Sequence, residues 1–156
     1  MPVGRWSLLR HPDEESADRG AAARNTALRL LLRWGVVFRE LCARERLPFP
    51  WRVLLHELRR LEAAGEARGG RFVDGFVGEQ FAMRQAVETL RRVRRERPDG
   101  NVTIVSAADP LNLTGIATPG ERVSPFTIQV VAYRDGLAVD AGELGAVRSR
   151  LQQSGA

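Results

Sequence analysis

The chain has 156 residues, of which 44% are hydrophobic and 28% are charged, and its formal net charge is +5 at pH 7. This balance is typical of a soluble globular protein rather than a disordered one, and no apolar run approaches the roughly 18 residues of a membrane span. All 24 basic residues are arginine, so the chain lacks the lysine of a Walker A loop and is not by itself a P-loop motor.

Histidine and cysteine are too scarce for an ordinary zinc site, since the chain has two histidines and one cysteine. A single cysteine cannot form an internal disulfide, and the start of the chain shows no apolar signal sequence, so we expect a reducing, cytoplasmic setting. The lack of lysine has two explanations, which are GC-rich codon usage and phosphate binding by the arginine fork. The positive balance in either case favours an anionic partner.

Composition shifts divide the chain into three parts, at residues 1–23, 24–97 and 98–156. The first part is a polar leading segment, in which residues 5–9 suit a short strand and residues 11–20 are typical of a loop. The second part shows helical periodicity, and the third turns to strand patterns.

The first helix of the second part is expected to begin near Arg24, with Asn25 or Thr26 as its N-cap. Gly35 is placed to end it in a left-handed cap, and a short strand is expected at 36–38. Helical spacing predicts a buried face that comprises Ala27, Leu30, Leu31 and Trp34.

A second helix is predicted at residues 39–46, followed by a proline turn at 48–50. The third helix begins at Pro50 or Trp51, runs to Ala64 and stops at Gly65. Its apolar face comprises Trp51, Leu54, Leu55, Leu58 and Leu61. Its opposite face comprises Arg52, His56, Arg59 and Arg60. That face is either the groove-facing side of a recognition helix or the solvated side of a structural helix.

Two wing strands are predicted at Arg68–Val73 and Phe76–Phe81, because Asp74-Gly75 between apolar runs is a strong hairpin signal. Arg68 and Arg71 on the first of these strands are candidates for contact with backbone phosphate. The order helix, strand, helix, turn, helix and wing predicts a winged helix, which usually presents one helix to a nucleic-acid groove.

A fourth helix is predicted over residues 84–97. Its expected buried face comprises Ala86, Val87, Leu90 and Val93. Its other face holds the densest positive patch of the chain, which comprises Arg91, Arg92, Arg94 and Arg95. Those arginines either cover apolar surface with their stems or form a ridge that follows phosphates, and we favour the ridge.

The third part follows a loop at 98–101 and is predicted to be a small antiparallel sheet or partial barrel, which makes the fold class α+β. Its strands are expected at 102–105, 114–117, 127–133 and 137–139. Asp135-Gly136 is a second hairpin signal.

Several long segments resemble one protein family, the bacterial large helicase-related (Lhr) superfamily-2 ATP-dependent DNA helicases, at their C-terminal end. The segments are GRWSLL, LLRWGVVFREL, PWRVLLHELRRLEAAGEARGGRFVDGFVGEQFA, SAADPLNLTGIATPGERV and YRDG. They cover the chain from Gly4 to about Gly136, whereas residues 137–156 match poorly.

The resemblance implies that this chain is the last winged helix of such a protein together with all or part of a closing β-barrel module. ATP and Mg²⁺ would then belong to a motor that this chain lacks, and we expect no cofactor here. It further implies DNA as the partner, packing on preceding winged-helix modules, self-association and a location at the bacterial nucleoid.

The resemblance also implies a relationship to winged-helix DNA glycosylases, which flip a base and use a carboxylate on the sugar or a water. The Gln-x-Asp or Gln-x-Gln motif of the related enzymes is missing, and Asp109 is the best carboxylate candidate. An aspartate before a proline is also typical of a turn, and this is the stronger interpretation of Asp109.

Three functions follow as hypotheses. The first is a DNA-binding module of a helicase or repair protein, with single-stranded or forked DNA favoured and RNA left open. The second is part of a uracil or alkyl-base glycosylase, and the third is a structural or oligomerisation module.

Overall fold

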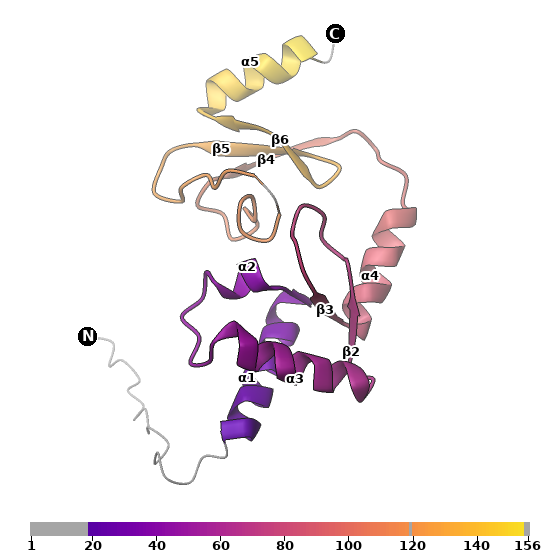
Figure 1. The fold of residues 1–156 in the computed structure, drawn as a ribbon. Coiled ribbons are helices and arrows are strands. Elements are labelled where there is room, and N and C mark those ends of the chain that lie inside the picture. The colour runs from indigo at the N-terminus through magenta and orange to yellow at the C-terminus, as the bar shows by residue number, and fades with distance from the viewer. Residues whose placement is uncertain (1–18, 119, 155–156) are drawn as a thin grey trace, which may run out of the picture.

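The computed structural model describes residues 19–118 and 120–154, and it places a helical half and a β half one above the other (Figure 1). The strand expected at 5–9 lies outside the described residues. The helical half comprises α1 (Arg19–Trp34), β1 (Val36–Val37), α2 (Arg39–Cys42), α3 (Trp51–Ala63), β2 (Ala67–Gly70), β3 (Gln80–Met83) and α4 (Arg84–Arg95). The β half comprises β4 (Val102–Ser106), β5 (Val130–Arg134), β6 (Leu137–Gly142) and α5 (Leu144–Ser154).

Helix α1 begins five residues earlier than predicted, because the alanines at 21–23 are strong helix formers and Ala23 is buried. The predicted N-cap is therefore wrong. Thr26 lies inside the helix, and its hydroxyl donates to the carbonyl of Ala22 at 2.9 Å. The predicted C-cap is confirmed, since Gly35 has a φ of 71° and its N–H donates to the carbonyl of Leu31.

The core lies between α1 and α3, and the predicted apolar face of α3 is confirmed. Leu54, Leu58 and Leu61 are buried against Leu30 and Leu31 of α1. The predicted stop is also confirmed. After Ala64, the N–H groups of Gly65 and Glu66 donate back to the carbonyls of Glu62 and Leu61, and Gly65 has a φ of 75°. This pair of hydrogen bonds is the Schellman arrangement that ends many helices.

Helix α2 is shorter than the predicted 39–46 and ends at Cys42. Residues 43–45 continue as a tight turn, in which the N–H groups of Arg44 and Glu45 donate three residues back, to Leu41 and Cys42. Cys42 is a core residue, and burial, with a smaller contribution from Glu45, raises the pKa of its thiol to about 12. The thiol therefore stays neutral at physiological pH.

The wing has shorter strands than predicted. β2 and β3 pair only over Ala67–Gly70 and Gln80–Met83, and β1 pairs with β3 in a sheet of order β1-β3-β2. The expected turn at Asp74-Gly75 is present, and Gly75 has a φ of 81°.

Beyond Gly70 and Gln80, a buried glutamine side chain replaces the backbone hydrogen bonds between the two wing strands. Gln80 has 0% exposure, its Oε1 accepts from the N–H groups of Phe72 and Val73, and its Nε2 donates to the carbonyl of Val73. The wing is closed further by Phe76, whose ring lies 4.3 Å from that of Phe38.

Helix α4 packs less than predicted. Leu90 is 41% exposed and Val93 is 54% exposed, and no residue of the helix is fully buried. Ala86 faces Gly35, where an added Cβ would lie 3.2 Å from the Ala86 Cβ. The helix ends at Arg95, two residues before the predicted end.

The β half is a three-stranded antiparallel sheet of order β4-β5-β6, so the predicted sheet is confirmed and it does not close into a barrel. Strand β5 begins at Val130, three residues later than expected. The strand expected at 114–117 is wrong, since that segment is a turn closed by a single bridge from Thr114 to Thr118. The predicted hairpin is confirmed, with positive φ at Asp135 and Gly136.

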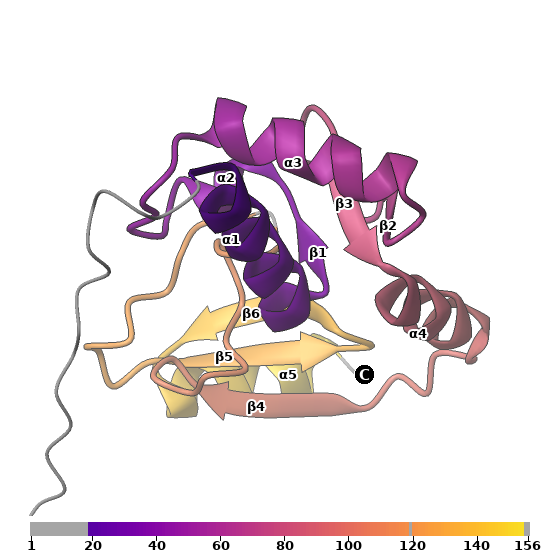
Figure 2. The same ribbon diagram turned by 90° about the horizontal axis from the view of Figure 1, so that it is seen from below.

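Both faces of this sheet are covered at its centre, because the neighbouring residues Val131 and Ala132 are both buried and point to opposite faces. The long loop before β5 covers one face, where the Tyr133 hydroxyl contacts Thr114 Oγ1 at 2.7 Å and Asn112 Oδ1 at 3.1 Å. Figure 2 shows that this loop lies between the sheet and the helical half.

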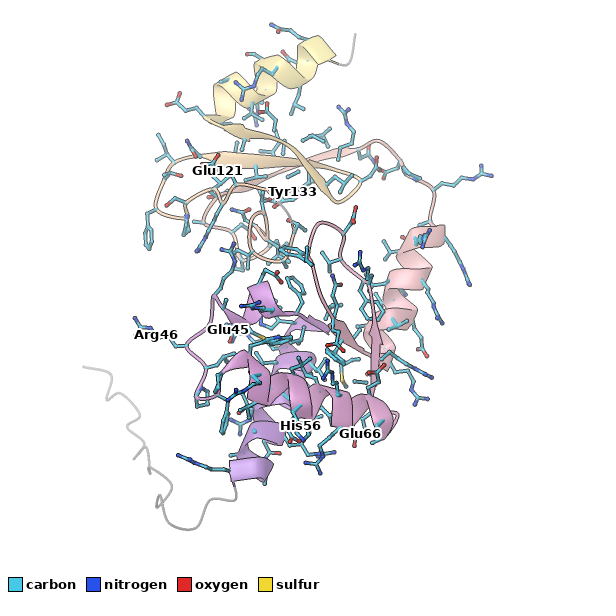
Figure 3. All side chains as sticks on the ribbon, viewed as in Figure 1. Glu45, Arg46, His56, Glu66, Glu121 and Tyr133 are labelled. Carbon is cyan, nitrogen blue, oxygen red and sulfur yellow. The ribbon has the colours of Figure 1, made fainter. Side chains whose placement is uncertain are left out.

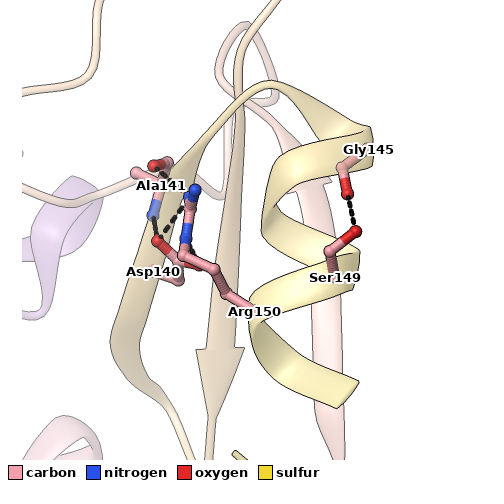
Figure 4. Close-up of polar contacts among 5 residues, drawn as sticks. All are labelled: Asp140, Ala141, Gly145, Ser149 and Arg150. Carbon is pink, nitrogen blue, oxygen red and sulfur yellow. Dashed lines mark hydrogen bonds and ion pairs between the residues drawn. The ribbon is translucent and has the colours of Figure 1, made fainter. Parts of the chain in front are cut away.

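Helix α5 was not predicted, and it covers the opposite face of the sheet. Val147 is its buried residue, and Arg150 holds the Asp140 carboxylate of β6 with contacts of 2.8 and 2.9 Å (Figure 4). The Arg150 hydrogen bond lowers the pKa of Asp140. Among the described helices, none combines the length and the apolar character needed to cross a lipid bilayer.

Replacement of Gln80 by methionine tests the role of this side chain. We expect Gln80→Met to lower the free energy of unfolding by about 2 kcal/mol, because it leaves the three backbone groups of Phe72 and Val73 without partners at nearly constant volume. Thermal and urea unfolding measure the change, and Gln85→Met at an exposed position of α4 is the control. Equal stability of the two variants would contradict this role.

Candidate nucleic-acid interface

The predicted basic face of α3 points into solvent. Arg52, His56, Arg59 and Arg60 are all exposed, and Figure 3 shows His56 on the outer side of the helix. Their positions follow from the core, since the burial of Leu54, Leu58 and Leu61 turns the opposite side of the helix outward.

Two of these four side chains are engaged by carboxylates. Arg59 Nη2 lies 2.6 Å from Glu79 Oε2 in the wing, and the hydrogen bond between them lowers the pKa of Glu79 and raises that of Arg59. Arg60 Nη1 lies 3.2 Å from Glu57, whose side chain is only 5% exposed. The Arg59–Glu79 pair is exposed on both sides, so a competing phosphate can displace Glu79 from Arg59.

The remaining predicted arginines are unpaired. Among the ion pairs and hydrogen bonds of the described residues, none involves the side chain of Arg52, Arg68 or Arg71, or of the four arginines predicted on α4. All of them are exposed. The face of α4 that carries Arg91, Arg92 and Arg95 also borders a shallow hollow, together with Glu88 and Glu96.

Strand β2 and helix α4 form a cleft of about 460 Å³ that brings three arginines together. Arg68 lines it from the strand, and Arg84 and Arg91 line it from the helix. Glu88 is the one carboxylate in the lining. Arg84 Nη2 also donates to the carbonyl of Gly65 at 3.0 Å, which ties the start of α4 to the end of α3. Arginines that line one cleft from two elements suit a phosphate, which accepts several charge-assisted hydrogen bonds.

Two of the cleft arginines, Arg68 and Arg91, were predicted from the sequence, and the third, Arg84, was missed. The signal for Arg84 is its spacing, because positions 84, 88, 91 and 95 lie on one stripe of a helix. Arg94 lines neither hollow, and Arg71 follows directly after β2.

The carboxylate candidate Asp109 has the geometry of a turn. Its Oδ1 accepts from the N–H of Leu111 at 2.8 Å, and its own N–H donates to the carbonyl of Ser106. This is the turn that its position before Pro110 predicted. A catalytic role for Asp109 stays a prediction.

Comparison with known proteins places this geometry in context. The model for the winged-helix domain of the large helicase-related protein matches residues 16–102. The Lhr helicase/uracil glycosylase of Escherichia coli K12 is 31% identical over 143 residues, which are 90% of this chain and 9% of that protein. The chain therefore spans about a tenth of the length of the curated relative that it matches.

Release of Arg59 from its carboxylate tests whether the α3 face contacts nucleic acid. We expect Glu79→Gln to tighten the binding of single-stranded DNA about two- to fivefold at low salt, because it removes a negative charge and frees the guanidinium. Fluorescence anisotropy measures the affinity. Glu143→Gln, an equal charge change before α5, is the control, and an identical effect of both variants would remove Arg59 from the interface.

Proposed function

The chain belongs to the large helicase-related protein family, and on that premise we propose that it is a module that binds DNA for a helicase of this family. The observation that carries the proposal is the cleft between β2 and α4, which Arg68, Arg84 and Arg91 line together. A polyanion is the kind of ligand that can neutralise three arginines at once. The exposed surface of α4 next to the cleft is also positively charged.

The charge continues along α4. Beyond the cleft, Arg92 and Arg95 extend the line of unpaired guanidinium groups toward the end of the helix. A phosphate backbone, with one charge at each nucleotide, matches such a row better than a single small anion does. The exposed residues of α3, Arg52 and His56, supply a second surface on the adjoining element.

The wing is held too firmly to act as a free arm. Gln80 braces the segment between β2 and β3 from within, and the Phe38–Phe76 contact holds this segment against the start of α2. The backbone of β2 that carries Arg68 is held by its pairing with β3, so it does not have to become ordered on binding. Contacts between arginine and phosphate are made to the DNA backbone and carry no sequence information. We therefore propose binding without sequence preference, to single-stranded or forked DNA.

A second candidate is a contribution to base excision, and the observation that favours it is the name of the E. coli relative, which includes uracil glycosylase. Asp109 is the residue proposed for it. Asn at this position keeps the oxygen that accepts from Leu111 N–H and removes only the charge, so Asp109→Asn preserves the turn.

Uracil-containing DNA tests this second candidate. If the chain contributes chemistry through Asp109, it produces alkali-labile abasic sites that Asp109→Asn abolishes. Cleavage that is equal in the two proteins would exclude Asp109, and the absence of abasic sites with both proteins would count against chemistry in this module.

A third role, in assembly, is supported by apolar side chains on the surface. Leu137 of β6 is 70% exposed and Val139 is 47% exposed, as expected for a sheet that packs on a partner. Leu90 and Val93 of α4 add a second apolar patch beside the arginines.

The dependence of binding on salt tests the primary proposal. We expect the double variant Arg68→Gln/Arg91→Gln to bind every DNA more weakly. The plot of log K against log salt, which falls, is expected to become shallower by between about 1.4 and 1.8, because two phosphate contacts are lost. Anisotropy titrations with single-stranded, duplex and forked DNA, and with single-stranded RNA, measure the slopes.

The matched control removes the same charge elsewhere. Arg29→Gln/Arg148→Gln changes two exposed arginines on α1 and α5 and is expected to leave the slope unchanged. No binding by the unaltered chain at low salt, or equal slopes for both double variants, would contradict the proposal.

A further inference from the structure

The loop that leads into β5 holds the most exposed large apolar side chain among the described residues. Phe126 is 97% exposed, and Ile128, two positions further on, is 88% exposed. The two are surrounded by polar residues of the same loop, including Ser124 and Thr127. An aromatic ring that is almost completely in water is costly, since its burial would stabilise the protein.

The turn that displays this ring is built by hydrogen bonds. Ser124 Oγ accepts from the N–H of Phe126 at 3.3 Å, and the Ser124 carbonyl accepts from the Thr127 hydroxyl at 2.8 Å and from its N–H. Pro125 fixes its own φ at the second position of this turn. The ring is therefore held outward by an ordered backbone, and a ligand that stacks on it does not have to order the loop.

The base of the loop is also fixed. Gly115 has a φ of 67°, and a Cβ at this position would lie 2.6 Å from the backbone nitrogen of Arg122. Only glycine permits this close approach of two backbone segments. It holds the start of the 121–129 segment against the turn at 114–118.

The surroundings of the ring are mixed in charge but offer cations for a phosphate. Arg122 is exposed in the same loop, next to Glu121. Arg46 is exposed in the helical half, and in Figure 3 it lies on the same side of the molecule as this loop. Behind the turn lies a hollow of about 600 Å³, which Ser124 and Gln129 line with polar groups and Val131 lines with an apolar one.

We propose that Phe126 stacks on an unpaired base of the bound nucleic acid, with Arg122 on a flanking phosphate. The inference rests on the proposed function, and it specifies which part of the DNA the β half binds. An aromatic ring offers a stacking surface for any base, and apolar side chains of this kind also insert between bases where a duplex is already weakened.

The area that Phe126 and Ile128 offer suits a base better than a protein partner. Stable protein interfaces bury roughly 800 Å² on each side, which is far more than two apolar side chains supply. A single base, by contrast, is covered by one ring. The positive net charge of the chain acts in the same direction.

Fluorescent base analogues test the proposal on the whole chain. The probes are a duplex with one unpaired 2-aminopurine, the same duplex fully paired, and a single strand that contains 2-aminopurine. We expect Phe126→Ala to weaken binding of the first and third probes about tenfold and to leave the paired duplex within about twofold. Binding is expected to quench the unpaired analogue, and Phe126→Ala is expected to lose the quenching.

Two further variants separate stacking from a general effect on the fold. Phe126→Trp is expected to restore affinity and to add an exposed tryptophan to the three that the chain already has, and the increment in emission over the unaltered chain is expected to be quenched by the single strand. Leu32→Ala, at a 70% exposed leucine of α1, is expected to change nothing. Equal circular dichroism and unfolding midpoints of all variants establish that the overall fold is intact.

The failure of this inference differs from the failure of the proposed function. Salt-dependent binding that shows no preference for unpaired bases and does not change in Phe126→Ala would overturn the stacking role alone. Absence of binding to every probe at low salt would overturn both. A sedimentation coefficient that Phe126→Ala lowers, with DNA binding unchanged, would assign the ring to a contact between copies of the chain instead.

Discussion

The packing of α3 against α1 determines where the helical half presents its positive charge. Leu54, Leu58 and Leu61 face Leu30 and Leu31, and this contact fixes the rotation of α3 about its own axis. A rotation by one residue, about 100°, would bury arginine and expose leucine, at a cost of several kcal/mol. The exposed face with Arg52 and His56 is therefore a consequence of the core.

The cleft depends on this packing through contacts at the ends of α3 and α1. Gly65 ends the helix and turns the chain into β2, and its carbonyl accepts from Arg84 at the start of α4. Gly35 lets α4 approach closely through Ala86. Strand and helix are thus set side by side, and their arginines meet in one cleft although 23 positions separate Arg68 from Arg91 in the sequence.

Local signals in the sequence predicted caps, helix faces and one hairpin well, because short-range chemistry decides these features. The caps at Gly35 and Gly65, the two faces of α3 and the hairpin at Asp135-Gly136 all depend on neighbouring residues. The bounds of the wing strands were wrong, since a buried Gln80 takes the place of the ladder and no periodicity shows a side-chain hydrogen bond. Periodicity also identifies the apolar face of α4 but says nothing about whether the chain offers Leu90 and Val93 a partner.

The candidate site also divides into features that the sequence predicted and features that required the fold. The candidate arginines of α3, β2 and α4, apart from Arg84, were chosen from type and spacing, whereas their sorting into paired and unpaired groups required the fold. Helix α5 was missed because its one buried residue, Val147, leaves almost no amphipathic pattern. The stacking role of Phe126 was equally invisible, since exposure is a property of the folded chain.

A map of the DNA footprint on the isotope-labelled chain tests the central claim most directly. In ¹H–¹⁵N correlation spectra titrated with a single-stranded oligonucleotide, the account predicts that the largest shifts fall on the amides of Arg68, Gly69, Val87 and Arg91 around the cleft. Amides of the outer face of α5, such as Arg148, would stay in place. Shifts confined to α5 or to the buried residues of α1, with the cleft amides unmoved at saturation, would contradict the account.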